Sequence, residues 1–233
     1  MALVFDIETV GEDWDTFDKS TQDALTRWLK KESRDEEEFE VGLEDLKSGL
    51  GFSPLTGFIV AIGVFDTEKE KGAVFFSAPE QTIEDTEEGG IRYKAQSEKE
   101  MLESFWAGAS AYEEFVSFNG RCFDAPFLLI RSAVHRVKPT CDLLSNRYLS
   151  LQRGTYHVDL LDQFSFYGAM RRKGSLHLFC RAFGIESPKV SGTTGDDVAN
   201  LYKEKRYADI ARYNAGDLFA TAKLFARWRE TFR

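Results

Sequence analysis

Cysteine, proline and long apolar runs are scarce in this chain of 233 residues. Its three cysteines, Cys122, Cys141 and Cys180, have neither paired nor zinc-like spacing. Such a sparse, odd count excludes a disulfide scaffold and indicates a reducing compartment. No apolar run approaches the roughly 18 residues of a membrane span, and the first nine residues lack the basic flank of a signal peptide. We therefore expect a soluble, cytoplasmic protein that does not interact with membranes.

The charge is distributed unevenly. The formal net charge is −9, but residues 1–120 hold 11 Lys/Arg and 28 Asp/Glu, whereas residues 121–233 hold 19 and 11. A simple positive coat for nucleic acid is therefore absent. The basic second half favours a face that binds a polyanion, although an uneven solvated surface explains the asymmetry equally well.

The pattern of apolar residues predicts an α/β protein. We expect strands near residues 2–7, 58–65, 73–76, 115–118 and 155–160, with the second and third forming a hairpin. We expect helices near 98–112, 124–136, 175–183, 196–203 and 206–228. Residues 11–50 are charged and read as a mostly helical insertion in a single domain of residues 1–233. The predicted architecture is a mixed five-stranded sheet flanked by helices.

Acidic residues at the end of the first predicted strand form a candidate metal site. Asp6 and Glu8 share one face of that strand, because side chains alternate along it, and a divalent cation would relieve their mutual repulsion. The same Asp-x-Glu spacing begins at Asp35, Asp66 and Asp85. Asp66 also follows a strand, but its charged neighbours predict a solvated hairpin tip.

Two further elements carry chemical groups. Asn119-Gly120-Arg121-Cys122-Phe123-Asp124 follows the fourth predicted strand, where Gly120 permits a tight turn and Asp124 begins a helix. On the last helix, Tyr213 and Asp217 share a face at i and i+4. Each element alone also fits a structural role, as a helix-start acid or a core tyrosine.

In this order and spacing, the three elements resemble the DEDD superfamily of 3′→5′ exonucleases, which has a ribonuclease H-like (DnaQ-like) fold. Asp6 and Glu8 match its first motif, Asp124 its second and Asp217 its third, while Tyr213 marks the Tyr subtype. The likeness extends to stand-alone exonucleases related to the proofreading domain of family-B DNA polymerases. The stretches that carry it are FDIET at 5–9, GFIVAIGV at 57–64, SFNGRCFDAPFL at 117–128, HVDLLD at 157–162 and YNAGDLFATAKLF at 213–225.

The resemblance implies a two-metal phosphodiester hydrolase. Four carboxylates suit two cations with hard oxygen ligands, Mg²⁺ or Mn²⁺. By resemblance Asp6 bridges both ions, Glu8 and Asp217 help to hold the ion on the nucleophile side, and Asp124 holds the second. Tyr213 orients the attacking water by its position, because a free Tyr titrates near 10 and is a poor base at neutral pH.

The expected substrate is single-stranded DNA or a frayed 3′ end, with no polymerase domain in this chain. Candidate contacts are an aromatic platform, two polar groups near the terminal nucleotide and a basic turn with its neighbours: Phe123; Thr9 and Asn119; and Arg171, Arg172, Lys173, Ser175 and Lys189. A structural Phe and a solvated basic loop explain these residues about as well. RNA as the substrate, and a non-catalytic nucleic-acid-binding module, stay open as alternatives.

Overall fold

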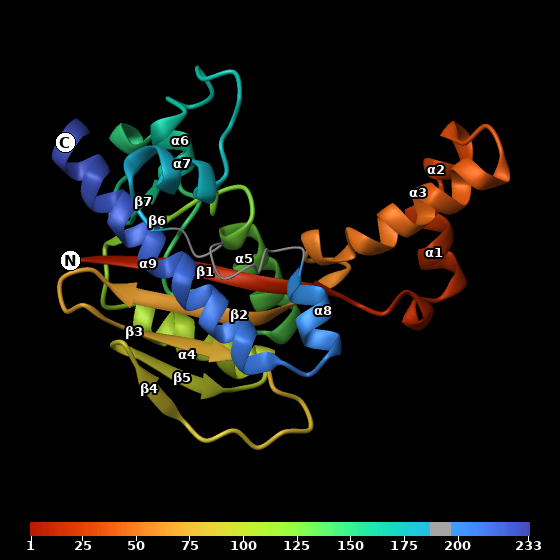
Figure 1. Ribbon diagram of the computed structural model, residues 1–233, viewed down its shortest axis with the longest axis horizontal. Coiled ribbons are helices and arrows are strands. Elements are labelled where there is room, and N and C mark those ends of the chain that lie inside the picture. Colours follow the sequence, from red (N-terminus) through yellow and green to blue (C-terminus); the bar gives the residue numbers. More distant parts are fainter. Residues whose placement is uncertain (187–196) are drawn as a thin grey trace.

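The computed structural model describes residues 1–186 and 197–233, and in this part of the chain a single mixed sheet forms the centre (Figure 1). Its seven strands have the order β4-β5-β3-β2-β1-β6-β7. Their bounds are β1 Ala2–Gly11, β2 Gly57–Asp66, β3 Lys71–Phe76, β4 Thr86–Glu88, β5 Ile91–Ala95, β6 Glu114–Ser117 and β7 Tyr156–Asp159. The α/β class with a mixed sheet flanked by helices is confirmed, and it is consistent with the ribonuclease H-like fold.

The predicted count of five strands is wrong, because β4 and β5 extend the sheet at one edge. β5 pairs in parallel with β3, and β4 pairs antiparallel with β5. All three residues of β4 are exposed, and β5 alternates buried or half-buried residues with exposed Arg92 and Lys94. Short polar edge strands lack the apolar signal that identifies the central strands.

Helices cover both faces of the sheet. α9 (Tyr207–Phe232) crosses one face, and α4 (Glu98–Ala109) and α5 (Asp124–His135) lie behind the other (Figure 1). In the described part of the body, the other helices are η3 Leu149–Leu151, α6 Leu160–Phe164, α7 Leu176–Phe183 and α8 Val198–Lys203. Along β1 the side chains alternate, so Ala2 and Val4 join the apolar cluster under α9, whereas Leu3, Phe5 and Ile7 join the cluster under α4 and α5.

Local signals set the helix ends that the sequence predicts. Ser97 begins α4 with a capping box, in which its hydroxyl accepts from the Glu100 N–H and the Glu100 carboxylate accepts from the Ser97 N–H. Pro126 lies in the first turn of α5, where a helix needs no N–H. At the other end of α5, Arg136 adopts a left-handed conformation with φ of 57°. The sequence therefore determines where these two helices begin.

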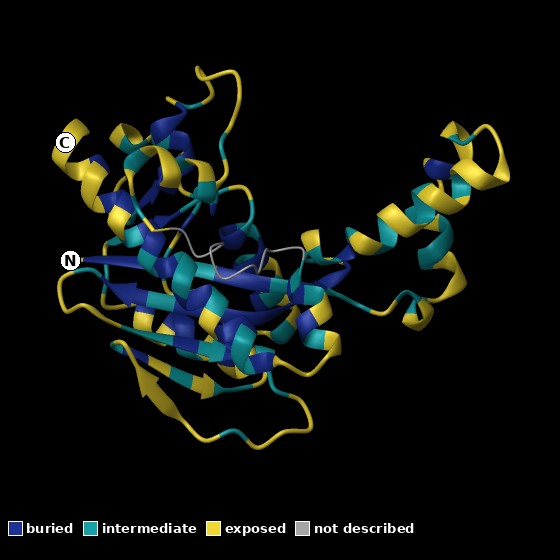
Figure 2. Ribbon diagram, viewed as in Figure 1, coloured by how far each residue is buried: buried dark blue, intermediate teal, exposed yellow. Residues whose placement is uncertain are grey.

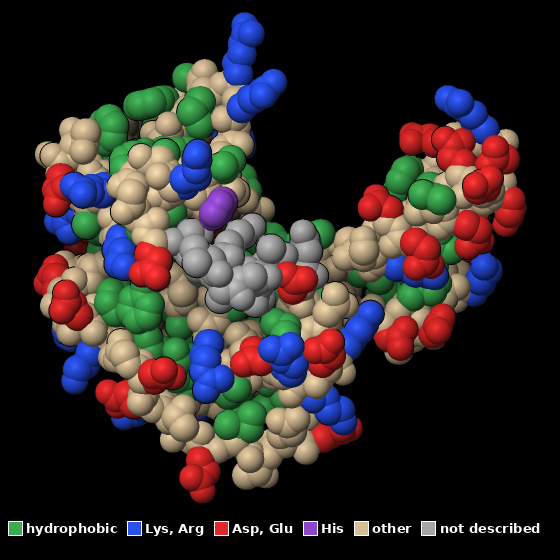
Figure 3. Space-filling view, viewed as in Figure 1, with side chains coloured by type: hydrophobic (Ala, Val, Ile, Leu, Met, Phe, Trp, Pro, Cys, Tyr) green, Lys and Arg blue, Asp and Glu red, His purple; other side chains and the backbone are tan. Residues whose placement is uncertain are grey.

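An arm of residues 14–52 projects from the body of the protein. It contains η1 Trp14–Thr16, α1 Lys19–Thr26, α2 Leu29–Glu32, α3 Glu36–Ser48 and η2 Leu50–Phe52. Figure 2 shows that the body is buried along its sheet, whereas most of the arm is exposed or half-buried. Acidic side chains gather on the arm, and a hollow separates it from the upper part of the body (Figure 3).

No helix of the described residues is long and apolar enough to cross a bilayer.

Candidate active site

Strand β1 carries two of the candidate residues near the middle of the sheet. Asp6 and Glu8 project to the α9 face, while Ile7 between them packs on the opposite side. β1 continues to Gly11, so the pair lies within the strand and not at its end as predicted. The register with β2 shifts between Glu8 and Thr9, an irregularity of the kind that often re-aims side chains beside active sites.

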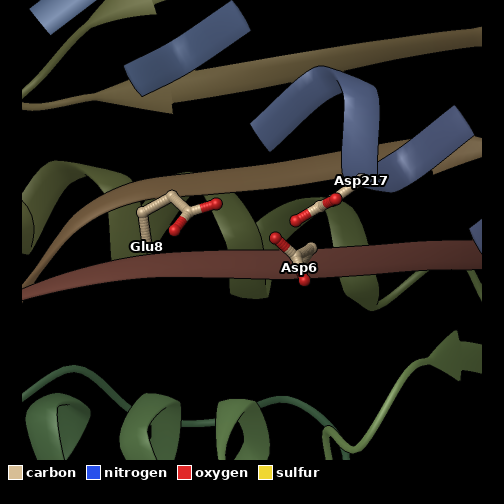
Figure 4. A group of neighbouring side chains, drawn as sticks. All are labelled: Asp6, Glu8 and Asp217. Atoms are coloured by element: carbon tan, nitrogen blue, oxygen red, sulfur yellow. The ribbon is translucent and has the colours of Figure 1, made fainter. Parts of the chain in front are cut away.

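Helix α9 brings a third carboxylate to this point. Oxygen atoms of Asp6, Glu8 and Asp217 all lie within 4.8 Å of one another. Figure 4 shows the three carboxylates turned toward a common space between β1 and α9. The predicted convergence of residues more than 200 positions apart is therefore present in the structure.

Asp124 is held next to this group by the edge of β1. Strand β6 pairs with β1 only at Ala2–Val4, so the Ile7 N–H has no strand partner, and it donates to Asp124 Oδ1 at 3.0 Å. Asp124 is 3% exposed. Its charge raises the pKa of Asp6, second only to burial among the causes. The fourth carboxylate thus acts electrostatically on Asp6, and it also raises the pKa of Glu8.

The turn before Asp124 differs from the predicted one. The residue with the left-handed backbone is Asn119, at φ 65°, and not Gly120. A Cβ at Gly120 would lie 2.2 Å from Ser117 Oγ, so this glycine is required for close approach. The N–H groups of Asn119 and Arg121 donate to the Asp159 carboxylate at 2.9 and 3.0 Å, which fixes the turn.

Burial and mutual repulsion raise the pKa values of the clustered carboxyl groups. For Asp6 burial is the largest cause, followed by the charges of Asp124, Asp217 and Glu8. Burial also raises the pKa of Glu8, with Asp217 adding to it. Burial raises the pKa of Asp124 to about 7, although the Ile7 N–H lowers it. Each group therefore resists ionisation unless a positive charge is present.

This donor set fits divalent metal ions. All the converging side chains offer carboxylate oxygens, the ligands that hard cations such as Mg²⁺ and Mn²⁺ prefer. A cation among them would neutralise the repulsion that raises their pKa values.

Tyr213 also faces the site from α9. Burial raises the pKa of Tyr213, and the charges of Asp217, Glu8 and Asp6 raise it further. The phenol therefore keeps its proton at neutral pH and serves as a hydrogen-bond donor there.

The predicted substrate contacts have mixed surroundings. The Thr9 hydroxyl donates to the Gly51 carbonyl at 2.7 Å, so its proton is already engaged. Phe123 is half-buried and packs against Phe127, with ring centroids 5.2 Å apart. Asn119 lies half-buried in the turn before Asp124.

The predicted basic turn lies on the surface before α7. Arg171, Arg172 and Lys173 are all exposed. Ser175 caps α7, where its hydroxyl accepts from the Leu178 N–H. Lys189 lies outside the described residues.

Two residues of the site were not identified from the sequence. Asn214 is fully buried, and its Nδ2 donates to Asp6 Oδ2 at 2.7 Å. Asp159 anchors the turn of Asn119, as described above. Both lie within stretches that carry the family resemblance, Asn214 beside Tyr213 and Asp159 in HVDLLD. Their place in these stretches is the one signal in the sequence that could have identified them.

The solvated hairpin tip predicted at Asp66 is wrong. Asp66 is 4% exposed and accepts hydrogen bonds from the N–H groups of Glu68 and Lys69 and from the Tyr112 hydroxyl. Burial alone would raise its pKa, but these donors together lower it to about 2. The side chain is buried because Tyr112, 46 residues away, packs over it.

The mixed sheet, with carboxylates gathered on β1 and on the crossing helix α9, is consistent with an α/β protein of the exonuclease fold. A model of the family described as a predicted 3′-5′ exonuclease related to the exonuclease domain of PolB matches residues 80–232, and the chain belongs to this family. The matched range contains Asp124, Tyr213 and Asp217, whereas Asp6 and Glu8 precede it. A comparison with curated proteins finds no match. Family membership supports nuclease activity of the 3′-5′ exonuclease type.

Proposed function

We propose that this protein is a metal-dependent 3′→5′ exonuclease that removes nucleotides from the 3′ end of single-stranded DNA. The observation that carries the proposal is the convergence of Asp6, Glu8 and Asp217 within 4.8 Å. Asp124 adds a fourth charge beside them. Membership of an exonuclease family supports hydrolysis as the use of this site.

The four carboxylates would hold two divalent cations, Mg²⁺ or Mn²⁺. By analogy with the DEDD superfamily, Asp6 would serve both cations, Glu8 and Asp217 would help to hold one, and Asp124 would help to hold the other. When bound, the cations would supply activation of the attacking water and stabilisation of the leaving 3′ oxygen. The raised pKa values of Asp6, Glu8 and Asp124 support this assignment, because cation binding offsets the cost of ionising them together.

Tyr213 positions the attacking water. Its hydroxyl keeps its proton beside the carboxylates, so it acts as a hydrogen-bonding group and not as a base. The backbone of the Asn119 turn is fixed by Asp159, which supports a role for the Asn119 side chain in holding the terminal nucleotide.

The exposed Arg171, Arg172 and Lys173 supply positive charge for the phosphates of the strand. On the opposite side of the hollow, the acidic arm repels the same phosphates (Figure 3). Phe123 offers a ring against which the last base packs.

Degradation of a 5′-labelled single strand tests the proposal. Wild-type protein and Asp6→Asn are incubated with DNA, and with RNA of the same sequence, in Mn²⁺, Mg²⁺ or EDTA. Asp85→Asn is the matched control, because Asp85 has the same Asp-x-Glu spacing but is exposed. We expect a 3′→5′ ladder on DNA that needs metal and Asp6 and that Asp85→Asn retains. A ladder on RNA in place of DNA would reassign the substrate, and no ladder on either strand would contradict an exonuclease.

A further inference from the structure

The side chain of Asn214 lies between α9 and the central strands, where it touches the carboxylates from the side of the helix. It is 0% exposed. Its Nδ2 group donates to Asp6 Oδ2 at 2.7 Å, and the same side chain lowers the pKa of Glu8. A primary amide donates N–H protons but carries no charge, so it acts on these carboxylates without changing the charge of the cluster.

The position opposite Asp6 on β2 is adapted to this amide. Gly63 is the strand partner of Asp6. A Cβ at Gly63 would lie 2.0 Å from Asn214 Oδ1 and 2.7 Å from Leu218 Cδ1. Because a contact under 3 Å forces a shift, only a residue without a side chain leaves room for the amide in this place.

The other end of the amide has no hydrogen-bond partner. Asn214 Oδ1 is one of two buried side-chain atoms without one in the described part of the chain. An unsatisfied buried acceptor costs about 1–3 kcal/mol. An orientation that leaves Oδ1 unpaired is retained because it aims the N–H donor at Asp6, which indicates that the amide serves the carboxylates and not the packing of the helix.

We propose that Asn214, with the space that Gly63 leaves for it, is the positioning residue that holds Asp6 and Glu8 in the orientation that binds divalent cations. The inference rests on the proposed metal-dependent function and adds a residue outside the carboxylate set. Groups that orient metal ligands by hydrogen bonds typically change metal affinity or activity 10–100-fold when removed. Asn214→Ala removes the donors, and Gly63→Ala displaces them from the opposite side.

Thermal stability during a Mn²⁺ titration of the metal-stripped protein tests this role. We expect the Mn²⁺ concentration at half-maximal stabilisation to rise at least about 10-fold in Asn214→Ala and in Gly63→Ala. Thr221→Ala is the control for α9 packing, since Thr221 is 1% exposed and lies two turns further along the helix. Gly108→Ala is the control for adding a methyl group, because nothing lies within 4 Å of its Cβ position. Both controls keep the wild-type midpoint.

A Mn²⁺ titration of DNA hydrolysis gives the second readout. The two variants should need more metal for half-maximal rate and regain most of the rate at saturating Mn²⁺, because no ligand is lost. An unchanged midpoint in Asn214→Ala, or an equal shift in Thr221→Ala, would overturn the positioning role. If Gly63→Ala does not fold, Asn214→Ser shortens the side chain without adding bulk and replaces it.

The two proposals fail in different ways. Wild-type protein that Mn²⁺ stabilises but that cleaves no DNA contradicts the exonuclease, while the stability titration still decides the role of Asn214. Wild-type protein that Mn²⁺ does not stabilise overturns the role of Asn214, since there is then no cation for the carboxylates to bind.

Discussion

Two neighbouring strands each carry the aspartate of an Asp-x-Glu triplet, in opposite electrostatic settings. On β2, Asp66 is buried among donors: two backbone N–H groups at 3.0 Å, the Tyr112 hydroxyl at 2.8 Å and Lys69 Nζ at 3.2 Å. On β1, Asp6 is surrounded by three other carboxylates and has one neutral donor, Asn214. The pKa of Asp66 falls to about 2, whereas that of Asp6 rises.

The difference shows that burial does not by itself distinguish a structural carboxylate from a functional one. Burial raises the pKa in both places, and the neighbours decide the outcome. A carboxylate with enough donors needs no further partner and stabilises the fold. Carboxylates buried together repel one another, and a cation among them relieves this repulsion, which marks a site.

Loss of a cluster carboxylate should give the largest effect. Asp217→Asn keeps the shape of the side chain but removes one charge from the metal ligands, so we expect the hydrolysis rate to fall about 10³-fold or more. Single-turnover degradation of labelled DNA in Mn²⁺ measures the rate, and far-ultraviolet circular dichroism checks the fold. A rate within 10-fold of wild type would remove Asp217 from the site.

The second largest effect should be the pH dependence of stability without metal, which separates the clustered carboxylates from Asp66. The pKa of Asp124 is about 7 in the folded protein and near 3.8 when unfolded, so the folded state binds the extra proton between these values. Its contribution is complete below about pH 4 and is lost as the pH rises through about 7, at about 1.4 kcal/mol per pH unit. Unfolding in EDTA at pH 5 to 8 should therefore show wild type losing stability relative to Asp124→Asn.

His157 is the reason for measuring a difference between two proteins. Burial lowers its pKa to about 4, so it acts in the opposite direction below pH 6.5, equally in both proteins. At pH 8, Mn²⁺ should restore the stability that wild type has lost relative to Asp124→Asn. Parallel pH curves for wild type and Asp124→Asn in EDTA would show that Asp124 is ionised without metal.

Tyr213→Phe should have a smaller effect than loss of a carboxylate. It removes a hydroxyl that positions water but no metal ligand, so we expect kcat to fall about 10–100-fold with KM little changed. The pKa of Tyr213 is raised, so the hydroxyl does not titrate near neutral pH, and the pH profiles of the two proteins should run parallel. A rate that falls at high pH in wild type but not in Tyr213→Phe would make Tyr213 a titrating group.

Local signals in the sequence predict many of the strands and helices that this comparison involves. The apolar residues of β1 and β2, the capping box at Ser97 and the i, i+4 pair of Tyr213 and Asp217 each act within a few residues. Their sum predicts the central sheet and the helices on its faces. The family resemblance then joins Asp6, Glu8, Asp124 and Asp217 into one group, which no local pattern does.

Contacts across the chain account for what the sequence did not predict. The burial of Asp66 depends on Tyr112, and the role of Asn214 depends on Asp6, 208 residues away, and on space at Gly63. Likewise β5 forms because β3 offers it an edge, and β4 then pairs with β5, while the polar sequence of β4 favours no strand. Such features follow from tertiary packing and have no periodic signature.

Asp66→Asn gives the converse test of the comparison, and the smallest effect. The amide keeps one acceptor oxygen but loses the charge that Lys69 and the N–H donors stabilise, so we expect the free energy of unfolding to fall by about 1–3 kcal/mol at pH 7. Because the folded pKa is lowered, the wild-type advantage is present above about pH 4 and disappears as the pH falls through about 2. Urea unfolding at pH 7 and pH 3 measures it, and the hydrolysis rate per folded molecule stays at the wild-type value. A loss of activity without a loss of stability would mean that Asp66 belongs with the site and that donors do not separate the two kinds of carboxylate.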